Sequence, residues 1–213
     1  MSVIGKLASS LVRRDEVPNQ ELAKQLVKKK DKAAIKELLD NMDNKNKNIQ
    51  SDCIKVLYEI AELEPSMIVP HAKRFVDLFE HKNNRNIWGA MHALDSITLK
   101  DPKFIYSNLP KIITAAEKGS VITKDHTVNI LIRLSSIKQY AQNAFTLLIE
   151  MLKDCATNQL AMYAERSMPV IDEKNKAIFI KTLRSRFDDI EKDSQRKRVE
   201  RVIKKADTMG TAK

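Results

Sequence analysis

The stretch RNIWGAMHALDSI (residues 85–97) decides the fold once it is set beside NIQSDCIKVLYEI (residues 48–60), which lies 37 residues earlier. The shift aligns a small residue and then two large apolar residues, and the same columns recur twice more at the same interval. The four sets are Cys53, Leu57 and Ile60; Ala90, Leu94 and Ile97; Thr127, Leu131 and Leu134; and Ala164, Met168 and Ile171. Because positions three and four apart share one face of a helix, each set predicts one buried helical stripe.

A second helix precedes each of these stripes at the same interval. Its core column is apolar throughout, and Pro65 and Pro102 mark two of its starts, since proline is tolerated at the first helical position. Residue types that cap helix N-termini also recur every 37 residues. The core column is Leu38, Phe75, Ile112 and Ile149, and the expected caps are Asn46, Asn83, Ser120, Thr157 and Ser194. The sequence therefore predicts repeated pairs of antiparallel helices.

Composition agrees with an all-α class. Only 4 Gly and 6 Pro occur in 213 residues, which is too few for the frequent turns of an all-β fold. Helix-forming residues dominate nearly every segment. The predicted pairs are 32–43 with 47–63, 65–80 with 84–99, 102–118 with 121–137, and 140–154 with 158–171.

A lone helix pair cannot bury both of its apolar stripes, so neighbouring pairs are expected to stack into a right-handed superhelical solenoid. The pattern resembles HEAT repeats, close relatives of armadillo repeats, over residues 32–205. The second helix NKNIQSDCIKVL (46–57) fits the family's spacing, although Gln50 stands where the family often has Arg. The resemblance implies a helical-hairpin array.

The ends depart from the repeat, as terminal capping units do. Residues 1–31 are expected to form N-terminal capping helices (2–13 and 19–30) within the same domain as the four hairpins of 32–171. Residues 172–207 are expected to be a C-terminal capping pair, whose last helix carries a single apolar stripe. Residues 208–213 are expected to be a disordered tail.

In HEAT-like arrays the second helices line the concave surface, which usually binds the partner. Trp88, the only Trp of the chain, falls outside the core columns and is expected on this surface, unless it packs under a neighbouring helix. An indole there can stack on a partner side chain or a base. The predicted binding residues are Lys55, Tyr58, Trp88, His92, Asp95, Asn129, Arg133, Tyr163 and Arg166.

No enzyme signature is present. The chain has no Walker-type glycine loop, GxGxxG, HExxH or GxSxG, and its four His residues show no metal spacing. The sequence favours a non-enzymatic scaffold that binds a protein partner on the concave surface, with no catalytic residue, metal or cofactor. Catalysis stays an open alternative, because sites on solenoids are assembled from distant repeats.

The alternative function is nucleic-acid binding, because the net charge is +10 and gathers at the chain ends. In repeat type and basic character the chain resembles the alkylpurine DNA glycosylases built from HEAT-like repeats. That resemblance implies roles at a lesion for Trp88, Asp95 and Arg133, although one Trp stands here in place of several. The basic terminal patch that could contact phosphates is Lys197, Arg201, Lys204 and Lys205. The alternative interpretation is that these residues are only the solvent-exposed face of a capping helix.

Cys53 and Cys155 are isolated, which is typical of reduced thiols in a cytoplasmic protein. No stretch approaches the ~18 apolar residues of a membrane-spanning helix. The sequence thus predicts a cytoplasmic protein, expected to be a monomer.

Overall fold

The computed structural model describes residues 2–209, which form helices and no β-strand, so the predicted all-α class is confirmed. The chain divides into two compact units, residues 1–127 and residues 128–213, and the boundary falls within helix α8 (Val121–Ser135). Of the expected tail, Thr208 and Met209 form a turn, while residues 210–213 lie outside the described residues. No helix of the described part is both long and apolar enough to cross a membrane.

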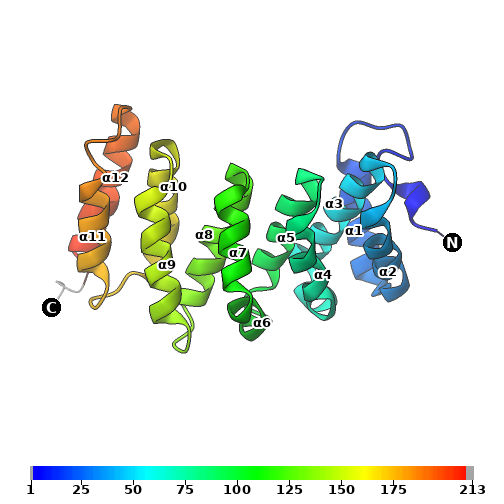
Figure 1. The fold of residues 1–213 in the computed structure, drawn as a ribbon, viewed down its shortest axis with the longest axis horizontal. Coiled ribbons are helices and arrows are strands. Elements are labelled where there is room, and N and C mark those ends of the chain that lie inside the picture. The colour runs from blue at the N-terminus through cyan, green and yellow to red at the C-terminus, as the bar shows by residue number, and fades with distance from the viewer. Residues whose placement is uncertain (1, 210–213) are drawn as a thin grey trace. The chain divides into compact units, whose positions relative to one another are not determined.

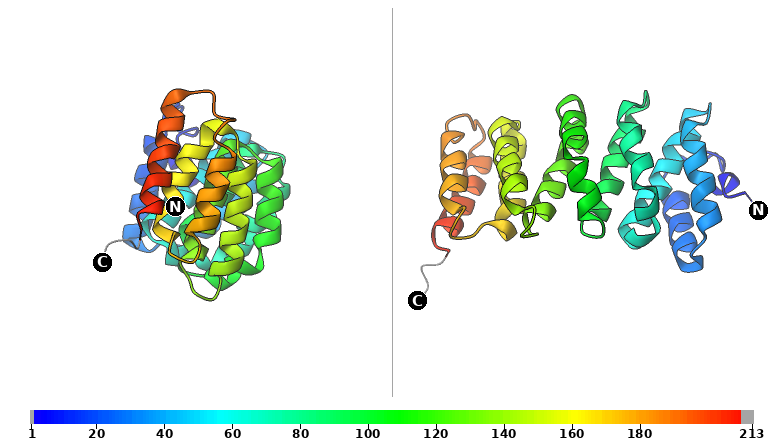
Figure 2. Two further views of the ribbon diagram at one scale, coloured as in Figure 1. Left: turned by 90° about the vertical axis from the view of Figure 1, so that its left-hand side faces the viewer. Right: turned by 60° about the horizontal axis from the view of Figure 1, so that its bottom comes forward.

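The first unit holds helices that run side by side as antiparallel pairs (Figures 1 and 2). Helix α3 packs against α1, α2 and α5, and α4 packs against α5. The helices are α1 (Val17–Lys29), α2 (Lys32–Asp40), α3 (Lys47–Leu63), α4 (Ala72–Asp77), α5 (Asn84–Ile97), α6 (Pro102–Ser107), α7 (Leu109–Lys118) and the start of α8.

The second unit holds the end of α8 and two further helix pairs. Helix α10 packs against α9 and α12, and α11 packs against α9 and α12. The helices are α9 (Ala141–Asp154), α10 (Thr157–Ser167), α11 (Lys176–Ser185) and α12 (Asp193–Asp207).

The columns read from the sequence form the core of both units. Each of the twelve residues in the four second-helix sets is buried, and so is the first-helix column of Leu38, Phe75, Ile112 and Ile149. On α12, Val199, Val202 and Ile203 are also buried. One side of every helix pair is thus withdrawn from water, which is the main favourable term in folding.

Three of the expected N-caps act as such, and one of them is Ser120, whose hydroxyl accepts from the Thr123 backbone N–H at 3.4 Å. The side chains of Asn46 and Asn83 accept hydrogen bonds from backbone N–H groups in the first turns of α3 and α5. Two other expected N-caps, Thr157 and Ser194, do not act as caps. Helix α10 begins at Thr157, after Ala156 in extended backbone, and α12 begins after Lys192 without a side-chain cap. The Asp193 carboxylate in the first turn of α12 meets the helix dipole instead.

The outer helices of the second and third pairs are more broken than predicted. Instead of one helix over 65–80, α4 has only 6 residues, preceded by 3₁₀ turns at Pro65–Met67 and Val69–His71 and followed by one at Leu78–Glu80. Pro70 has no N–H to donate and disfavours helix at the residue before it. Likewise, the helix predicted over 102–118 is split at Asn108, two residues before Pro110.

The predicted helix over residues 2–13 was also wrong. Only Ile4–Lys6 forms a 3₁₀ turn, and the segment closes at Val12, whose φ of 56° lies in the left-handed region. The backbone N–H of Arg13 donates to the Ala8 carbonyl at 2.8 Å, as at a helix C-terminus. Leu11, inside the predicted helix, is 50% exposed.

Side chains of the first unit hold this N-terminal segment in place. One Asp52 oxygen on α3 accepts from the Ser9 backbone N–H at 2.7 Å, and the other accepts from the Asn19 side chain at 2.7 Å. The Asn19 oxygen in turn accepts from the Ala8 backbone N–H at 3.0 Å. Hydrogen bonds from outside the segment therefore replace those that a helix would have supplied.

The left-handed backbone at Val12 predicts that Val12→Gly stabilises the protein. A β-branched residue is strained there, whereas Gly is not, and the entropy that Gly adds to the unfolded chain offsets part of the gain; we expect about 1 kcal/mol. Val12 is 92% exposed, so no packing is lost. Urea unfolding measures the change. The control is Val17→Gly, because Val17 is 49% exposed but starts helix α1, and this change should destabilise.

Candidate functional site

Four rings from three successive second helices form a stack in the first unit, here called the ring ladder: Trp88, Tyr58, His92 and His126. The Trp88 and Tyr58 rings are tilted by 49° with centroids 5.7 Å apart. Tyr58 stacks on His92 at 4.3 Å, and His92 stacks on His126 at 4.1 Å. The ladder thus joins α3, which carries Tyr58, to α5 and to the first turns of α8.

Each histidine of the ladder is paired with a carboxylate from the preceding second helix. His92 Nε2 lies 2.5 Å from Glu62 Oε1, and His126 Nδ1 lies 2.9 Å from Asp95 Oδ2. The Glu62 side chain is 49% exposed, whereas the Asp95 side chain is only 5% exposed. The buried Asp95 therefore fixes the orientation of His126, and Glu62 presents negative charge to solvent.

A buried lysine adjoins the Tyr58 ring of the ladder. Lys55 Nζ lies 2.8 Å from Glu16 and 2.7 Å from Glu59, and 4.8 Å from the Tyr58 ring centroid. Burial of Lys55 disfavours its charge, but hydrogen bonds with Glu16 and Glu59 outweigh that effect and hold the pKa of the ammonium above its usual value. Lys55 is thus committed to these two carboxylates.

The ladder and its partners are acidic, although the chain is basic. Four carboxylates (Glu16, Glu59, Glu62 and Asp95) stand against the single ammonium of Lys55 and two histidines. Glu16 comes from the residue before α1, outside the repeat columns, and no periodicity in the sequence could have indicated it. Opposite charge favours a cationic partner at this surface and disfavours a phosphate backbone.

The predicted binding residues differ widely in exposure. In the first unit Trp88 and His92 are half-buried, while Lys55, Tyr58 and Asp95 are buried and support them. In the second unit Tyr163 is buried and Arg133 is half-buried. Arg166 is exposed, and its guanidinium donates to the Asn129 side chain at 3.5 Å.

Residues of the basic terminal patch lie on the exposed side of α12. Lys197 pairs with Asp193 at 2.8 Å, and the Arg201 guanidinium donates to the Lys197 carbonyl at 3.4 Å. Lys204 and Lys205 are exposed in the last turn, where positive charge meets the helix dipole. Positions that carry buried, mostly apolar residues in the other second helices are thus occupied in α12 by charged residues on its solvent-exposed side.

Within residues 2–209, no group of three or more His, Cys, Asp or Glu residues is placed to hold a metal ion. Cys53 and Cys155 are both free thiols and buried, as expected of reduced cysteines. Burial raises the pKa of the Cys53 thiol to about 12. This thiol is therefore not a reactive nucleophile near neutral pH.

Glu62 should contribute stability that is lost in acid. Its hydrogen bond with His92 is the main cause of a pKa below the usual 4.5; the charges of His92 and Lys55 add to it and burial opposes it. A carboxyl with a depressed folded-state pKa stabilises the native state above its unfolded pKa and loses this effect as pH falls through the folded value.

Glu62→Gln should therefore reduce stability at pH 6 by less than about 1 kcal/mol, because the pair is half exposed to solvent, and the difference should vanish towards pH 3. Urea titrations followed by Trp88 emission measure it. Glu80→Gln, at an exposed carboxylate outside the ladder, is the control. A deficit that stays constant from pH 6 to pH 3 would show that the ion pair is not its origin.

Neither a protein-family model nor a curated protein matches the chain. Solved structures, however, are similar to it in fold. An engineered protein, Northeast Structural Genomics Consortium target OR366, is similar at 17% identity and a TM-score of 0.61, over 98% of this chain and 100% of the other. The designed armadillo repeat protein YIII(Dq)4CqI is similar at 12% identity and a TM-score of 0.61, over 89% and 92% of the two chains.

A further designed armadillo repeat protein, YIII(Dq.V1)4CPAF, is similar at 14% identity and a TM-score of 0.63, over 88% of this chain and 86% of the other; its structure is a complex with the peptide (KR)4. The fold is therefore a HEAT/armadillo-like helical solenoid. The expected resemblance to alkylpurine DNA glycosylases is not shown by these similarities.

Proposed function

We propose that this protein is a non-enzymatic scaffold that binds a cationic segment of a protein partner on the second helices of its first unit. In HEAT-like arrays the second helices line the concave face, which supports this choice of surface. The observation that carries the proposal is the ring ladder with its acidic neighbours: a half-buried indole packs on a buried tyrosine, and four carboxylates pair with Lys55 and the two histidines beside it. Aromatic anchors surrounded by complementary charge are typical of the residues that dominate binding energy at protein interfaces.

The chemistry of the ladder fits lysine and arginine side chains. A guanidinium or ammonium over an indole face gains cation–π energy, and Glu62 and Glu16, with side chains 49% and 46% exposed, can pair with it. One similar designed protein is found in complex with (KR)4, which supports a basic peptide as the first ligand to test.

Nucleic-acid binding is the second candidate, and its support is the exposed Arg201, Lys204 and Lys205 of α12. A duplex held there would leave the acidic ladder unused. The glycosylase version has less support, because Asp95, the only carboxylate of helix α5, is buried and bonded to His126. A protein partner remains the better account of the ladder.

The test is fluorescence anisotropy of labelled (KR)4 with the wild-type protein and two matched variants. Glu62→Gln removes one negative charge from the ladder and should weaken binding roughly three- to tenfold. Glu117→Gln removes one from an exposed position of α7 in the same unit, outside both the ladder and the groove, and should leave affinity unchanged. Equal losses for both variants would mean attraction by overall charge and would contradict a ladder site. Tighter binding of a labelled DNA duplex than of (KR)4 would favour the second candidate.

A further inference from the structure

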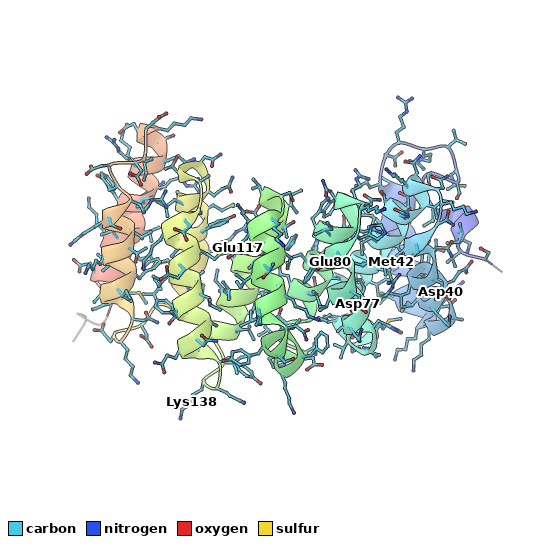
Figure 3. The ribbon with its side chains drawn as sticks, in the orientation of Figure 1. Asp40, Met42, Asp77, Glu80, Glu117 and Lys138 are labelled. Atoms are coloured by element: carbon cyan, nitrogen blue, oxygen red, sulfur yellow. The ribbon has the colours of Figure 1, made fainter. Side chains whose placement is uncertain are left out.

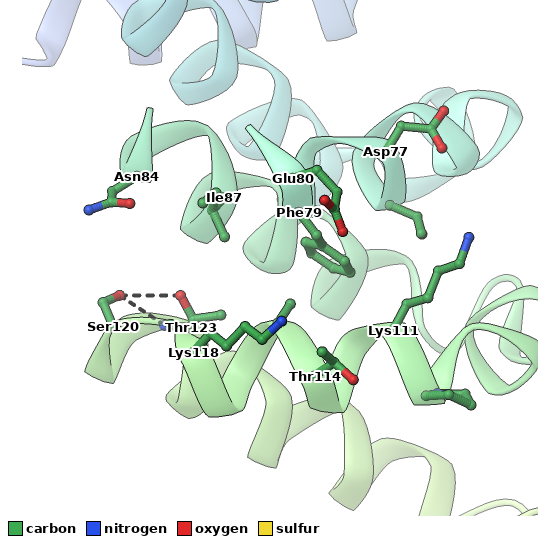
Figure 4. A pocket seen from close by; sticks show the side chains of 14 residues that line it. Asp77, Phe79, Glu80, Asn84, Ile87, Lys111, Thr114, Lys118, Ser120 and Thr123 are labelled. Carbon is green, nitrogen blue, oxygen red and sulfur yellow. Dashed lines mark hydrogen bonds between the residues drawn. The ribbon is translucent and has the colours of Figure 1, made fainter. Parts of the chain in front are cut away.

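A groove separates the outer parts of the second and third helix pairs, away from the ring ladder (Figure 4). Its volume is about 750 Å³, within the range of pockets that hold ligands or anchor side chains. Phe79, Ile87 and Ala115 supply apolar surface, and polar and charged side chains form the walls. One wall comes from α4, the 3₁₀ turn after it and the first turn of α5, and the other from α7 and the first turn of α8.

The groove follows from local sequence. Helix α4 is limited to 6 residues by the turns around Pro70, so the second pair presents a shortened outer helix to α7. On the other wall Gly119 allows a close turn between α7 and α8, because a Cβ there would lie 2.6 Å from the Ala115 carbonyl oxygen and 2.9 Å from Thr123. These features leave space where two full-length helices would pack.

The two walls carry opposite charge. Asp77 and Glu80 lie together on the second helix pair (Figures 3 and 4), and Lys111 and Lys118 project from α7 on the other side. Asp77 pairs with Lys73, on its own helix, at 2.8 Å. Among the described residues, neither Lys111 nor Lys118 forms an ion pair with Glu80 or Asp77, so the charges flank the groove without closing it.

We propose that this groove is a second docking site, which takes an amphipathic helix of a partner protein with one acidic and one basic flank. Lys111 and Lys118 are seven residues apart on α7, two helical turns or roughly 10.5 Å, so acidic residues at i and i+7 of a helix lying along α7 would meet both. Basic residues on its other flank would meet Asp77 and Glu80. The apolar stripe between the flanks would pack on Phe79, Ile87 and Ala115. The site is independent of the ladder.

Three labelled synthetic peptides test the charge pattern. All share one leucine stripe at i, i+3, i+4 and i+7; the first carries Lys on one flank and Glu on the other, the second Lys on both, and the third Glu on both. The wild-type protein should bind the mixed peptide roughly five- to tenfold more tightly than the others, because only this peptide can pair with both walls. If the mixed peptide lies along the groove in the opposite direction, its two charged flanks change places. One of the two directions therefore matches the walls, and the binding direction need not be known in advance.

Two protein variants locate the binding. Lys111→Glu/Lys118→Glu makes both walls acidic and should move the preference to the peptide with Lys on both flanks. Thr114→Trp places an indole in the groove at an exposed position and should abolish binding of the mixed peptide, whereas Thr146→Trp, at an exposed position of α9, should not. Equal binding of the three peptides to the wild type, absence of binding, or an unchanged preference in the double variant would overturn the proposal.

Discussion

Replacing Phe75 with alanine should lower the free energy of unfolding by about 3–5 kcal/mol, the usual cost of truncating a buried Phe. Phe75 is fully buried at the first-helix column of the second pair, between the short helix α4 and α5. Trp88 lies in the same unit and is the only Trp, so its emission during urea unfolding reports on this unit alone.

Phe79 provides the matched control for this prediction. It lies four residues further along the same outer segment, but it is half-exposed at the groove wall. Phe79→Ala should cost about 1 kcal/mol or less, because little area is withdrawn from water there. Similar losses for the two variants would mean that the column positions do not define the core.

Asp52→Ala should cost about 3 kcal/mol, because two charge-assisted hydrogen bonds of roughly 1.5 kcal/mol or more each are lost and the buried Asn19 loses an acceptor. The N-terminal segment should detach before the unit unfolds. Trypsin should then cut after Arg13 and Arg14 much faster than in the wild type. Asp77→Ala is the control: Asp77 pairs with the exposed Lys73, so this substitution should cost no more than about 0.5 kcal/mol.

Asp52→Ala with wild-type resistance to trypsin would contradict this role. It would mean that apolar contacts of Leu7 and Ala8, both buried, hold the segment without the polar network.

The core could be predicted because burial follows helical periodicity. Columns such as Leu57 and Leu94 are apolar for the same reason in every pair, since each faces the neighbouring helix. The interruptions of the outer helices could not be predicted from periodicity in the same way. Pro70 and Pro110 were visible in the sequence, but whether a proline ends a helix or starts one depends on where the chain must turn. At the N-terminus Ile4, Leu7 and Ala8 have helical spacing, but tertiary hydrogen bonds made by Asp52 hold the segment in a different conformation.

The candidate site was only partly predictable. Column positions placed Trp88 and His92 outside the core, yet the stacking of His92 between Tyr58 and His126 depends on the separation of three helices. The acidity of the surface was hidden by the net charge of +10, because a sum over the chain does not say which face carries it. Glu16 reaches Lys55 from the irregular start of the chain, where no repeat applies.

The most direct test of the account is the emission of Trp88 during a titration with (KR)4, compared with a peptide of alternating Glu and Asp at the same ionic strength. Because Trp88 is the only Trp and part of the ring ladder, a cationic segment bound there must change its emission. The account predicts a saturable change with (KR)4 and none with the acidic peptide, at a midpoint equal to that from anisotropy. Saturable binding of (KR)4 with no change at Trp88 would place the peptide elsewhere and contradict the central claim.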